Sequence, residues 1–588
     1  MLSVSGRYVP AGVVFPEVTS DLTTFLALLR TLSRTDVVFS CAKINHILSN
    51  NSTMTHVEKQ AFFVNRYLTP AEAARIEQYA RAHREMPAVV FRGALLEVIR
   101  WAVLVCQDAA SDGTTFQNPT ARRTFAAVVL IASDLWGQRV YGSALALDDG
   151  IHATRERSVG PFRNAIEGAL VAPVLAHSLG RGWTLFSSML PQEEPLFLER
   201  FEAAVGMNIR EYYACASAMV TNYLRPGSAA TIFDANTFGG TTRKPDSLQR
   251  FLALESQTLC ELRHALWGGT EEAAILGQAA PLYEYRRLRE KPLFRATDGR
   301  TICSDPVFMS DKLSIGPFFH ALPLYAQEGQ ANRFFASFGR VFERYIQQLL
   351  RRIFPATPSL FDPLTFNMMI KCGHTDACEI DACLNYVTEV FLFESKATWL
   401  REEDFAPENA ATLLASLHHK YGISPDRDKG AAQLAKAVCM IAGDGGCERT
   451  EAFRSVQQVT PVLVVHDELL SAPGFGYFVA TEFLEALGKL GCGKSDRTAS
   501  IPFVSPIVLT AADLEMLEVS LEHFSFREVL TDYGNASPDR MISFQTFLAT
   551  DAKYAKRIYA SRHLAAQAME PLTIAMEELF GQRPSPPK

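Results

Sequence analysis

The sequence predicts a multidomain protein with a mostly α-helical N-terminal region and an α/β region in its C-terminal half. Three observations lead to this prediction. The chain has 588 residues, more than a single hydrophobic core normally organises. Apolar residues recur three and four positions apart over most of residues 1–280, as they do in amphipathic helices. Beyond about residue 330, a long amphipathic helix is followed by short strand-like runs, as in a mixed sheet flanked by helices.

The N-terminal helices are predicted from their periodicity and from the Gly, Asn and Asp clusters between them. Thr69 and Pro70 form a helix start, with Thr69 as the N-cap and Pro70 at the first helical position. Further helices are predicted over 93–107, 121–135, 193–205, 210–224 and 247–267. No motif here indicates a chemistry, so we expect residues 1–284 to form a helical domain for recognition or regulation.

Composition and charge exclude some classes of protein. The hydrophobic content of 48% and the charged content of 21% are those of an ordinary globular protein. A net charge of -7 and a pI near 6.1 argue against a protein that coats nucleic acid, although a local basic groove is compatible with them. The eleven cysteines lack the spacing of a disulfide framework, and no signal sequence or membrane span is evident. We therefore expect a cytoplasmic protein without a membrane partner.

A basic run, composed of Arg286, Arg287, Arg289, Lys291 and Arg295, follows the helical region. It has two interpretations: a solvated helix face, or an edge that contacts phosphate groups.

Two short strands joined by a turn near Asn385 are predicted over 378–397. The second strand is apolar and ends in Glu394-Ser395-Lys396. Because strand side chains repeat every second residue, Glu394 and Lys396 share a face, where burial is costly unless they have partners. Asp381 on the first strand could join Glu394 on one Mg²⁺ ion, with Lys396 beside them. An ion pair without a catalytic role is the alternative.

Predicted elements flank this strand pair on both sides. Helix 332–354 has a broad apolar stripe with Glu343 beside it, and a helix over 430–442 contains Gln433. A strand is predicted over 459–465. The remaining predicted elements, mostly helical, cover 477–487, 506–509, 511–524 and 552–580, and the tail 583–588 is expected to be disordered.

In this order the segments resemble the PD-(D/E)xK nuclease superfamily, which has the restriction-endonuclease-like fold. The resemblance rests on four segments: Phe338-Gly339-Arg340-Val341-Phe342-Glu343-Arg344-Tyr345, Glu379-Ile380-Asp381, Glu394-Ser395-Lys396 and Lys429-Gly430-Ala431-Ala432-Gln433-Leu434. It covers about 330–470, and Ile380 replaces the proline of the strict motif.

The resemblance implies an αβββαβ core in a mixed sheet flanked by helices. It also implies that Asp381 and Glu394 are ligands of Mg²⁺ or Mn²⁺ and that Lys396 is the catalytic lysine. Glu343 would be a further acidic residue at the metal or in its shell, and Gln433 a polar positioning residue. Members of the superfamily cleave DNA more often than RNA.

The expected domains are therefore a helical domain over 1–284, a nuclease-like α/β domain over 285–510 and a helical extension over 511–588. The expected function is a divalent-metal-dependent nuclease, most simply a DNA endonuclease of restriction or anti-phage defence. An activating partner protein or a homo-oligomer would control it. The alternative is a non-catalytic nucleic-acid-binding or scaffold protein that keeps a nuclease-like core.

Two other patterns indicate different chemistries. Residues 488–495 match the GxxxxGK[ST] phosphate-binding loop, but a predicted helix rather than a strand precedes them, which favours a helix C-cap. Cys372, His374, Cys378 and Cys383 lie close together in sequence, but their spacing matches no paired zinc motif. We expect these cysteines to be small buried apolar residues.

Overall fold

A computed structural model describes most of the chain. The described residues are 8–49, 56–83, 88–107, 115–145, 175–223, 232–234, 242–267, 285–296, 300–356, 362–372, 376–400, 410–422, 429–443, 451–472, 474–492, 503–540, 542–554 and 561–581. They form two compact units. Unit 1 contains the described residues up to Gly329 together with those from His563 onward, and unit 2 contains Gln330–Arg562. In the described chain, unit 2 is thus inserted into unit 1.

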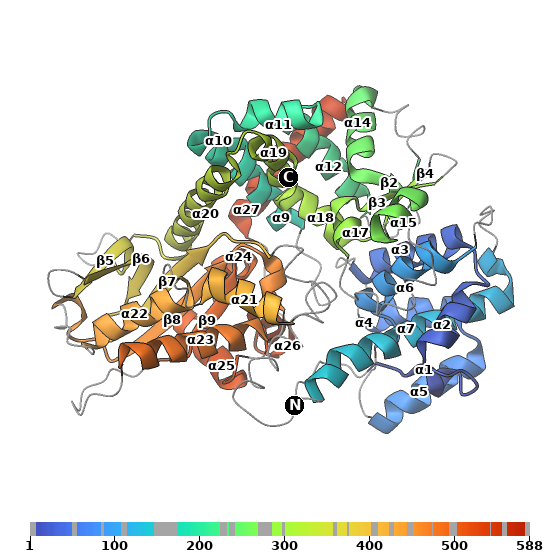
Figure 1. Ribbon diagram of the computed structural model, residues 1–588, viewed down its shortest axis with the longest axis horizontal. Coiled ribbons are helices and arrows are strands. Elements are labelled where there is room, and N and C mark those ends of the chain that lie inside the picture. The colour runs from blue at the N-terminus through green and yellow to red at the C-terminus, as the bar shows by residue number, and fades with distance from the viewer. Residues whose placement is uncertain are drawn as a thin grey trace. The chain divides into compact units, whose positions relative to one another are not determined.

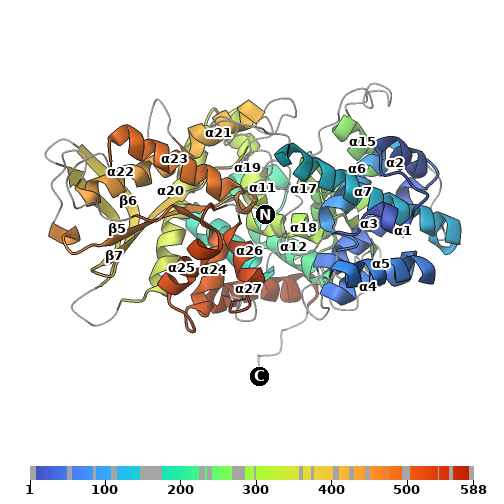
Figure 2. The ribbon, with the colours of Figure 1, turned by 90° about the horizontal axis from the view of Figure 1, so that it is seen from below.

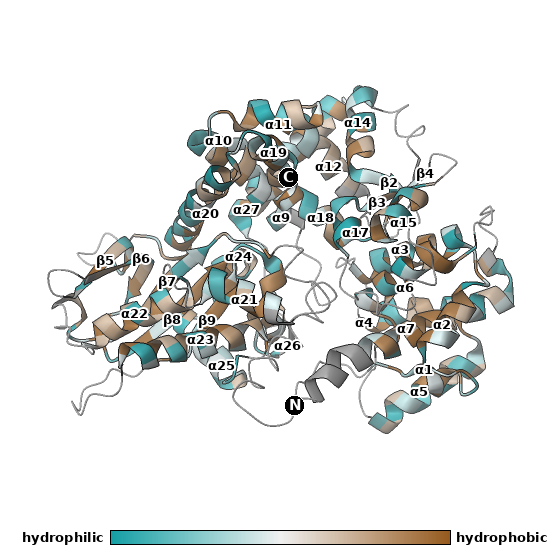
Figure 3. Ribbon diagram, viewed as in Figure 1, coloured by the Kyte–Doolittle hydropathy of each residue, from teal (hydrophilic) through white to brown (hydrophobic). Residues whose placement is uncertain are grey.

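The first part of unit 1 is helical. Its elements are α1 (Ala11–Val14), α2 (Leu22–Leu29), α3 (Arg34–Ser49), α4 (His56–Tyr67), α5 (Pro70–His83), α6 (Arg92–Val105), the short 3₁₀ turn η1 (Thr115–Gln117) and α7 (Pro119–Leu145). All residues of α6 are buried, so this helix forms the centre of the local core. Apolar stretches, brown in Figure 3, are concentrated in helices such as α2 and α7. The predicted start of α5 is confirmed, because Thr69 and Glu72 cap each other's backbone N–H groups.

The second part of unit 1 combines helices with a small mixed sheet. The helical elements are α9 (Leu175–Trp183), the π-helical turn η2 (Thr184–Met189), α10 (Leu190–Glu193), α11 (Phe197–Val205), α12 (Ile209–Tyr223), α14 (Pro245–Glu255), α15 (Leu259–Trp267), α17 (Arg286–Glu290), α18 (Pro306–Ser314) and α19 (Gly316–Gln327). The strands, in the sheet order β1-β4-β3-β2, are β1 (Ile232–Asp234), β4 (Arg300–Cys303), β3 (Leu293–Arg295) and β2 (Ser256–Thr258). The single helix predicted over 247–267 is wrong, because β2 interrupts it to pair in parallel with β3.

The basic run of the sequence lies on α17 and β3, where carboxylates surround it. Arg286 and Arg287 both pair with Glu290, and Arg289 pairs with Asp311 at 2.6 Å. These ion pairs favour the interpretation of the run as a helix face within unit 1.

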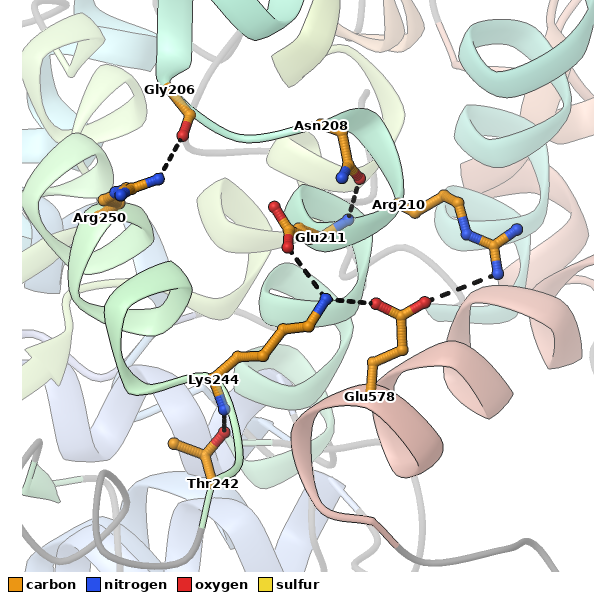
Figure 4. A network of polar contacts seen from close by, with 8 residues as sticks. All are labelled: Gly206, Asn208, Arg210, Glu211, Thr242, Lys244, Arg250 and Glu578. Atoms are coloured by element: carbon orange, nitrogen blue, oxygen red, sulfur yellow. Dashed lines mark hydrogen bonds and ion pairs between the residues drawn. The ribbon is translucent and has the colours of Figure 1, made fainter.

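The C-terminal segment returns to unit 1 and is held there by polar contacts. It consists of α27 (Arg562–Ile574) and the π-helical turn η6 (Ala575–Leu579). Lys244 Nζ lies 2.8 Å from Glu578 and 3.0 Å from Glu211, and Arg210 also faces Glu578 (Figure 4). The backbone carbonyl of Leu579 accepts a hydrogen bond from the Thr242 hydroxyl at 2.8 Å.

Unit 2 is built on a five-stranded mixed sheet. Its elements are α20 (Ala331–Ile353), β5 (Leu364–Cys372), β6 (Asp376–Asn385), β7 (Glu389–Lys396), α21 (Ala410–Tyr421), α22 (Ala431–Ala442), the 3₁₀ turns η4 (Glu451–Phe453) and η5 (Glu468–Ser471), β8 (Gln458–Val465), α23 (Phe475–Leu490), β9 (Ile507–Thr510), α24 (Ala511–Ser520), α25 (Phe526–Ala536) and α26 (Phe544–Thr550). The strand order is β5-β6-β7-β8-β9. The pairs β5–β6 and β6–β7 are antiparallel, whereas β7–β8 and β8–β9 are parallel.

Helices cover both faces of this sheet (Figures 1 and 2). Alternation along β7 separates the two faces, since Phe391 and Phe393 pack against Phe526 of α25. On that side α20 also packs on α24, where the Tyr345 hydroxyl donates a 2.6 Å hydrogen bond to Glu515. On the other face lie α22 and α23, so Glu394 and Lys396 point toward α22.

The expected domain boundaries differ from those of the two units. Residues 285–329 belong to unit 1, because β3 and β4 pair with β1 and β2. Residues 511–562 belong to unit 2, where β9 extends the sheet and α24 packs on α20. Coarsely, the predicted multidomain, helix-rich architecture with an α/β region is confirmed. None of the helices in the described ranges combines the length and the apolar character that a membrane span requires.

Candidate active site

The candidate site lies where strands β6 and β7 separate. Their last paired residues are Ala382 and Phe393. The next residues toward the opening are Asp381 on β6 and Glu394 on β7. Beyond this point β6 remains paired with β5, and β7 remains paired with β8 as far as Lys396. The Asp381 carboxylate takes part in the opening, because its Oδ2 accepts a 2.6 Å hydrogen bond from the backbone N–H of Ser395. Asp381 and Glu394 are thereby held at facing positions of two diverging strands.

Glu394 is almost completely buried at the end of the apolar run of β7. Its Oε1 accepts a hydrogen bond from Lys396 Nζ, whereas its Oε2 has no hydrogen-bond partner among the described residues. Burial is the main cause that raises the pKa of Glu394 to about 8, although the nearby Lys396 ammonium lowers this pKa. The Asp381 and Glu343 carboxylates add to the increase. A buried carboxylate oxygen without a partner is costly, so this position favours a cationic ligand.

Glu343 of α20 belongs to the same electrostatic group. The pKa of Glu343 is raised to about 7 by partial burial and by the Asp381 and Glu379 carboxylates, while Lys396 lowers it. Burial also raises the pKa of Asp381, against the effects of Lys396 and of the Ser395 hydrogen bond. We call Glu343, Asp381 and Glu394 the carboxylate cluster. The carboxylates raise one another's pKa, which indicates a negative potential at the cluster that a bound cation would neutralise.

Lys396 reaches the cluster from the end of β7 and is also held by α22. Its Nζ lies 3.4 Å from Gln433 Oε1, and Gln433 Nε2 donates a 3.0 Å hydrogen bond to the Glu379 carbonyl. Gly430 allows α22 to begin here, because its φ of 48° is left-handed and a Cβ atom would lie 2.8 Å from the Tyr421 carbonyl oxygen. The structure thus brings Gln433 to Lys396, while the positioning role expected for Gln433 stays a prediction.

All five predicted site residues therefore lie around one opening, but two further residues were missed. Gln347, one helical turn after Glu343, donates from Nε2 to Glu343 Oε1 at 3.3 Å and to Asn367 Oδ1 at 2.7 Å. The spacing of four between Glu343 and Gln347 was a signal for this contact. No sequence pattern pointed to Asn367, since β5 was not predicted.

The cluster could hold a divalent ion with few protein ligands. Among the described residues, no group of three or more His, Cys, Asp or Glu side chains is placed to hold a metal ion, so the cluster offers at most two such ligands. Mg²⁺ commonly uses one or two carboxylates and keeps several waters, which Asp381 and Glu394 can satisfy. The assignment of Asp381, Glu394 and Glu343 as metal ligands therefore stays a prediction.

The other sequence patterns do not form a competing site in the described residues. Cys378 and Cys383 are buried thiols, while His374 lies outside the described residues. Gly491, with a left-handed φ of 73°, ends α23 as the expected C-cap. The remainder of the 488–495 loop, from Gly493, is outside the described residues.

No protein-family model, curated protein or solved structure matches this chain. The interpretation of the carboxylate cluster therefore rests on its geometry and its charges.

Proposed function

We propose that this chain is a divalent-metal-dependent nuclease, most simply a DNA endonuclease, with its active site at the carboxylate cluster. The order of elements in unit 2 supports the proposal. Helix α20 is followed by three antiparallel strands, by α21 and α22, and then by β8 parallel to β7. Apart from the additional helix α21, this order is compatible with the αβββαβ core that the resemblance to PD-(D/E)xK nucleases implies.

The observation that carries the proposal is the buried Glu394 carboxylate beside Asp381 and Lys396. A packed strand normally ends in apolar or paired residues, because an unpaired buried oxygen costs free energy. Here Glu394 keeps one oxygen without a partner among the described residues and faces two other carboxylates. A bound Mg²⁺ or Mn²⁺ ion would neutralise charge on the scissile phosphate and make a water acidic enough to attack it.

Each of the five site residues has a defined part in this proposal. Asp381 and Glu394 hold the ion, with Glu343 as a third carboxylate at the ion or at one of its waters. Lys396, whose side chain is 21% exposed, is within reach of both the cluster and an incoming phosphate group. Its ammonium orients the attacking water and balances the negative charge that develops on the phosphate oxygens. Gln433 restricts the position of Lys396.

Positive charge beside the cluster supports a nucleic-acid substrate. Arg340 and Arg344 are exposed on α20, within one turn of Glu343. Arginine contacts to phosphate position a nucleic acid without reading its sequence. These side chains can therefore supply local affinity in a protein whose net charge is negative.

The test is cleavage of a plasmid and of a structured RNA, with and without Mg²⁺. The Glu394→Gln and Lys396→Met variants keep the side-chain volume and remove one charge each. Glu485→Gln and Lys489→Met on the exposed face of α23 are matched controls. We expect Mg²⁺-dependent cleavage by the parent and both controls, and loss of at least ~100-fold in the two site variants.

Equal cleavage by the site variants and the controls would reject the site. Binding of nucleic acid without cleavage by the parent, at any Mg²⁺ or Mn²⁺ concentration, would instead favour the non-catalytic alternative.

A further inference from the structure

Gln347 lies at the junction of three structural elements that surround the carboxylate cluster. It belongs to α20 and follows Glu343 by one turn, so both side chains project from the same face of the helix. Its Nε2 lies 3.3 Å from Glu343 Oε1, 2.7 Å from Asn367 Oδ1 on β5 and 3.5 Å from the Asp381 carbonyl oxygen on β6. A primary amide has two hydrogens to donate. Gln347 therefore links Glu343 to the two strands that carry Asn367 and Asp381.

Asn367 has an unusual backbone conformation at the position of β5 that faces Asp381. The pairs Phe366–Ala382 and Met368–Ile380 place Asn367 directly opposite Asp381 in the β5–β6 register. Its φ of 49° is left-handed, which is rare in a strand, and asparagine is one of the few side chains that tolerate it. Such strain persists where the surrounding contacts fix it, and it concentrates at functional sites.

We propose that Gln347 is a positioning residue that, together with Asn367, holds the Glu343 carboxylate beside Asp381. The inference rests on the proposed nuclease function and assigns to it two residues outside the motif. Two carboxylates near each other repel, so a side chain free to rotate would move Glu343 away from the cluster. The Gln347 amide opposes this movement because it donates to Glu343 while Asn367 fixes the amide. Partners of this kind orient the ligands of metal sites and affect metal affinity.

The experiment compares Gln347→Leu with Gln348→Leu in the full chain. Gln348 is the next residue of the same helix and is exposed, so its variant controls for the loss of one glutamine. Mn²⁺ affinity is measured by titration calorimetry, and kcat and KM by cleavage of a DNA duplex. For Gln347→Leu we expect Mn²⁺ affinity and kcat to fall by about 10-fold or more, with KM for DNA unchanged. Gln348→Leu should match the parent.

The Asn367→Gly variant tests the role of the Asn367 side chain while the backbone conformation is kept. Glycine adopts the same φ without strain, so the fold of β5 is retained while the Oδ1 acceptor is lost. We expect the same direction of change in Mn²⁺ affinity as for Gln347→Leu. Parent-like affinity in Asn367→Gly would overturn the role given to Asn367.

The outcomes distinguish failure of this inference from failure of the proposed function. If the parent cleaves DNA and Gln347→Leu has the Mn²⁺ affinity and kcat of Gln348→Leu, the inference is overturned and the nuclease remains. If the parent neither binds Mn²⁺ nor cleaves, the proposed function fails and the inference is overturned with it.

Discussion

Asp381 accepts a hydrogen bond from the backbone N–H of Ser395 at the point where β6 and β7 separate. The acceptor is a side-chain carboxylate, so one group both closes the end of the strand pair and carries charge into the opening. Mutation can therefore separate the structural role of Asp381 from its chemical role.

Substitution of Asp381 by asparagine should abolish cleavage while leaving the fold stable. The amide oxygen can still accept the Ser395 hydrogen bond, but the charge for the metal ion is lost. Asp381→Ala should in addition lower the free energy of unfolding by about 1 kcal/mol, because a partly buried N–H loses its partner. Urea unfolding of both variants measures the difference. Equal stability of the two variants would contradict the structural role of this carboxylate.

Divalent metal should stabilise the parent protein against heat but not the Glu394→Gln variant. A ligand that binds only the folded state at roughly 100 times its dissociation constant stabilises it by about 2.7 kcal/mol. Glu394→Gln removes the buried charge that attracts the ion, so its melting temperature should not depend on Mg²⁺ or Mn²⁺. Differential scanning calorimetry with and without EDTA measures the shift, with Glu485→Gln as the control. A metal-dependent shift of equal size in Glu394→Gln would place the ion elsewhere.

Unit 1 should lose stability in mild acid through two buried histidines. Burial lowers the pKa of His46 and of His177 to about 4, and Arg181 contributes at His177. The folded state therefore binds fewer protons than the unfolded state between about pH 6.5 and 4. The stabilising effect is complete above pH 6.5 and is lost as the pH falls toward 4, by roughly 2 kcal/mol per histidine at pH 5.

Tryptophan fluorescence can follow this loss in unit 1 alone. Of the five tryptophans only Trp399 is in unit 2, so a Trp399→Phe background reports on unit 1. In that background, His46→Gln should reduce the difference in urea stability between pH 7.5 and pH 5. An unchanged difference would show that His46 is not the titrating group.

Gly180→Ala should weaken the attachment of the C-terminal segment to unit 1. A Cβ atom at Gly180 of α9 would lie 2.3 Å from the backbone oxygen of Leu564 in α27. Backbone atoms cannot move aside cheaply, so we expect a loss of about 3 kcal/mol in the free energy of unfolding. Gly12→Ala in α1 is the control, because no atom lies within 4 Å of its Cβ position. Equal unfolding midpoints for the two variants in urea would contradict the close packing of α9 and α27.

The parts of the fold that sequence could predict are those fixed by local pattern. Helix α20 has an apolar stripe along its whole length, and the apolar run of β7 ends abruptly in charge, so both were predicted. Strand β5 was missed because apolar and polar residues alternate only weakly along this edge strand. It also contains Asn367 at a position unsuited to a strand. Strand β2 was missed because it forms by pairing with β3, which lies more than thirty residues further along the chain.

The same distinction applies to the candidate site. Glu394, Lys396 and Asp381 stand out because charged residues occur where a strand pattern expects burial. Gln347 looks like any surface glutamine of a helix, and only its contacts to Glu343 and Asn367 distinguish it. Long-range pairing therefore decides which polar residues reach the cluster, and a single sequence does not contain that information in local form.

The insertion of unit 2 into unit 1 has a consequence for the order in which the two can fold on the ribosome. Domains generally fold as their residues emerge. The described part of unit 2 is complete once Arg562 has been synthesised, whereas α9 and Lys244 of unit 1 must wait for Leu564 and Glu578. The sheet and its carboxylate cluster can thus fold while unit 1 still lacks α27. Unit 1 can complete its own packing only after Glu578 has been synthesised, later than the sheet that carries the cluster.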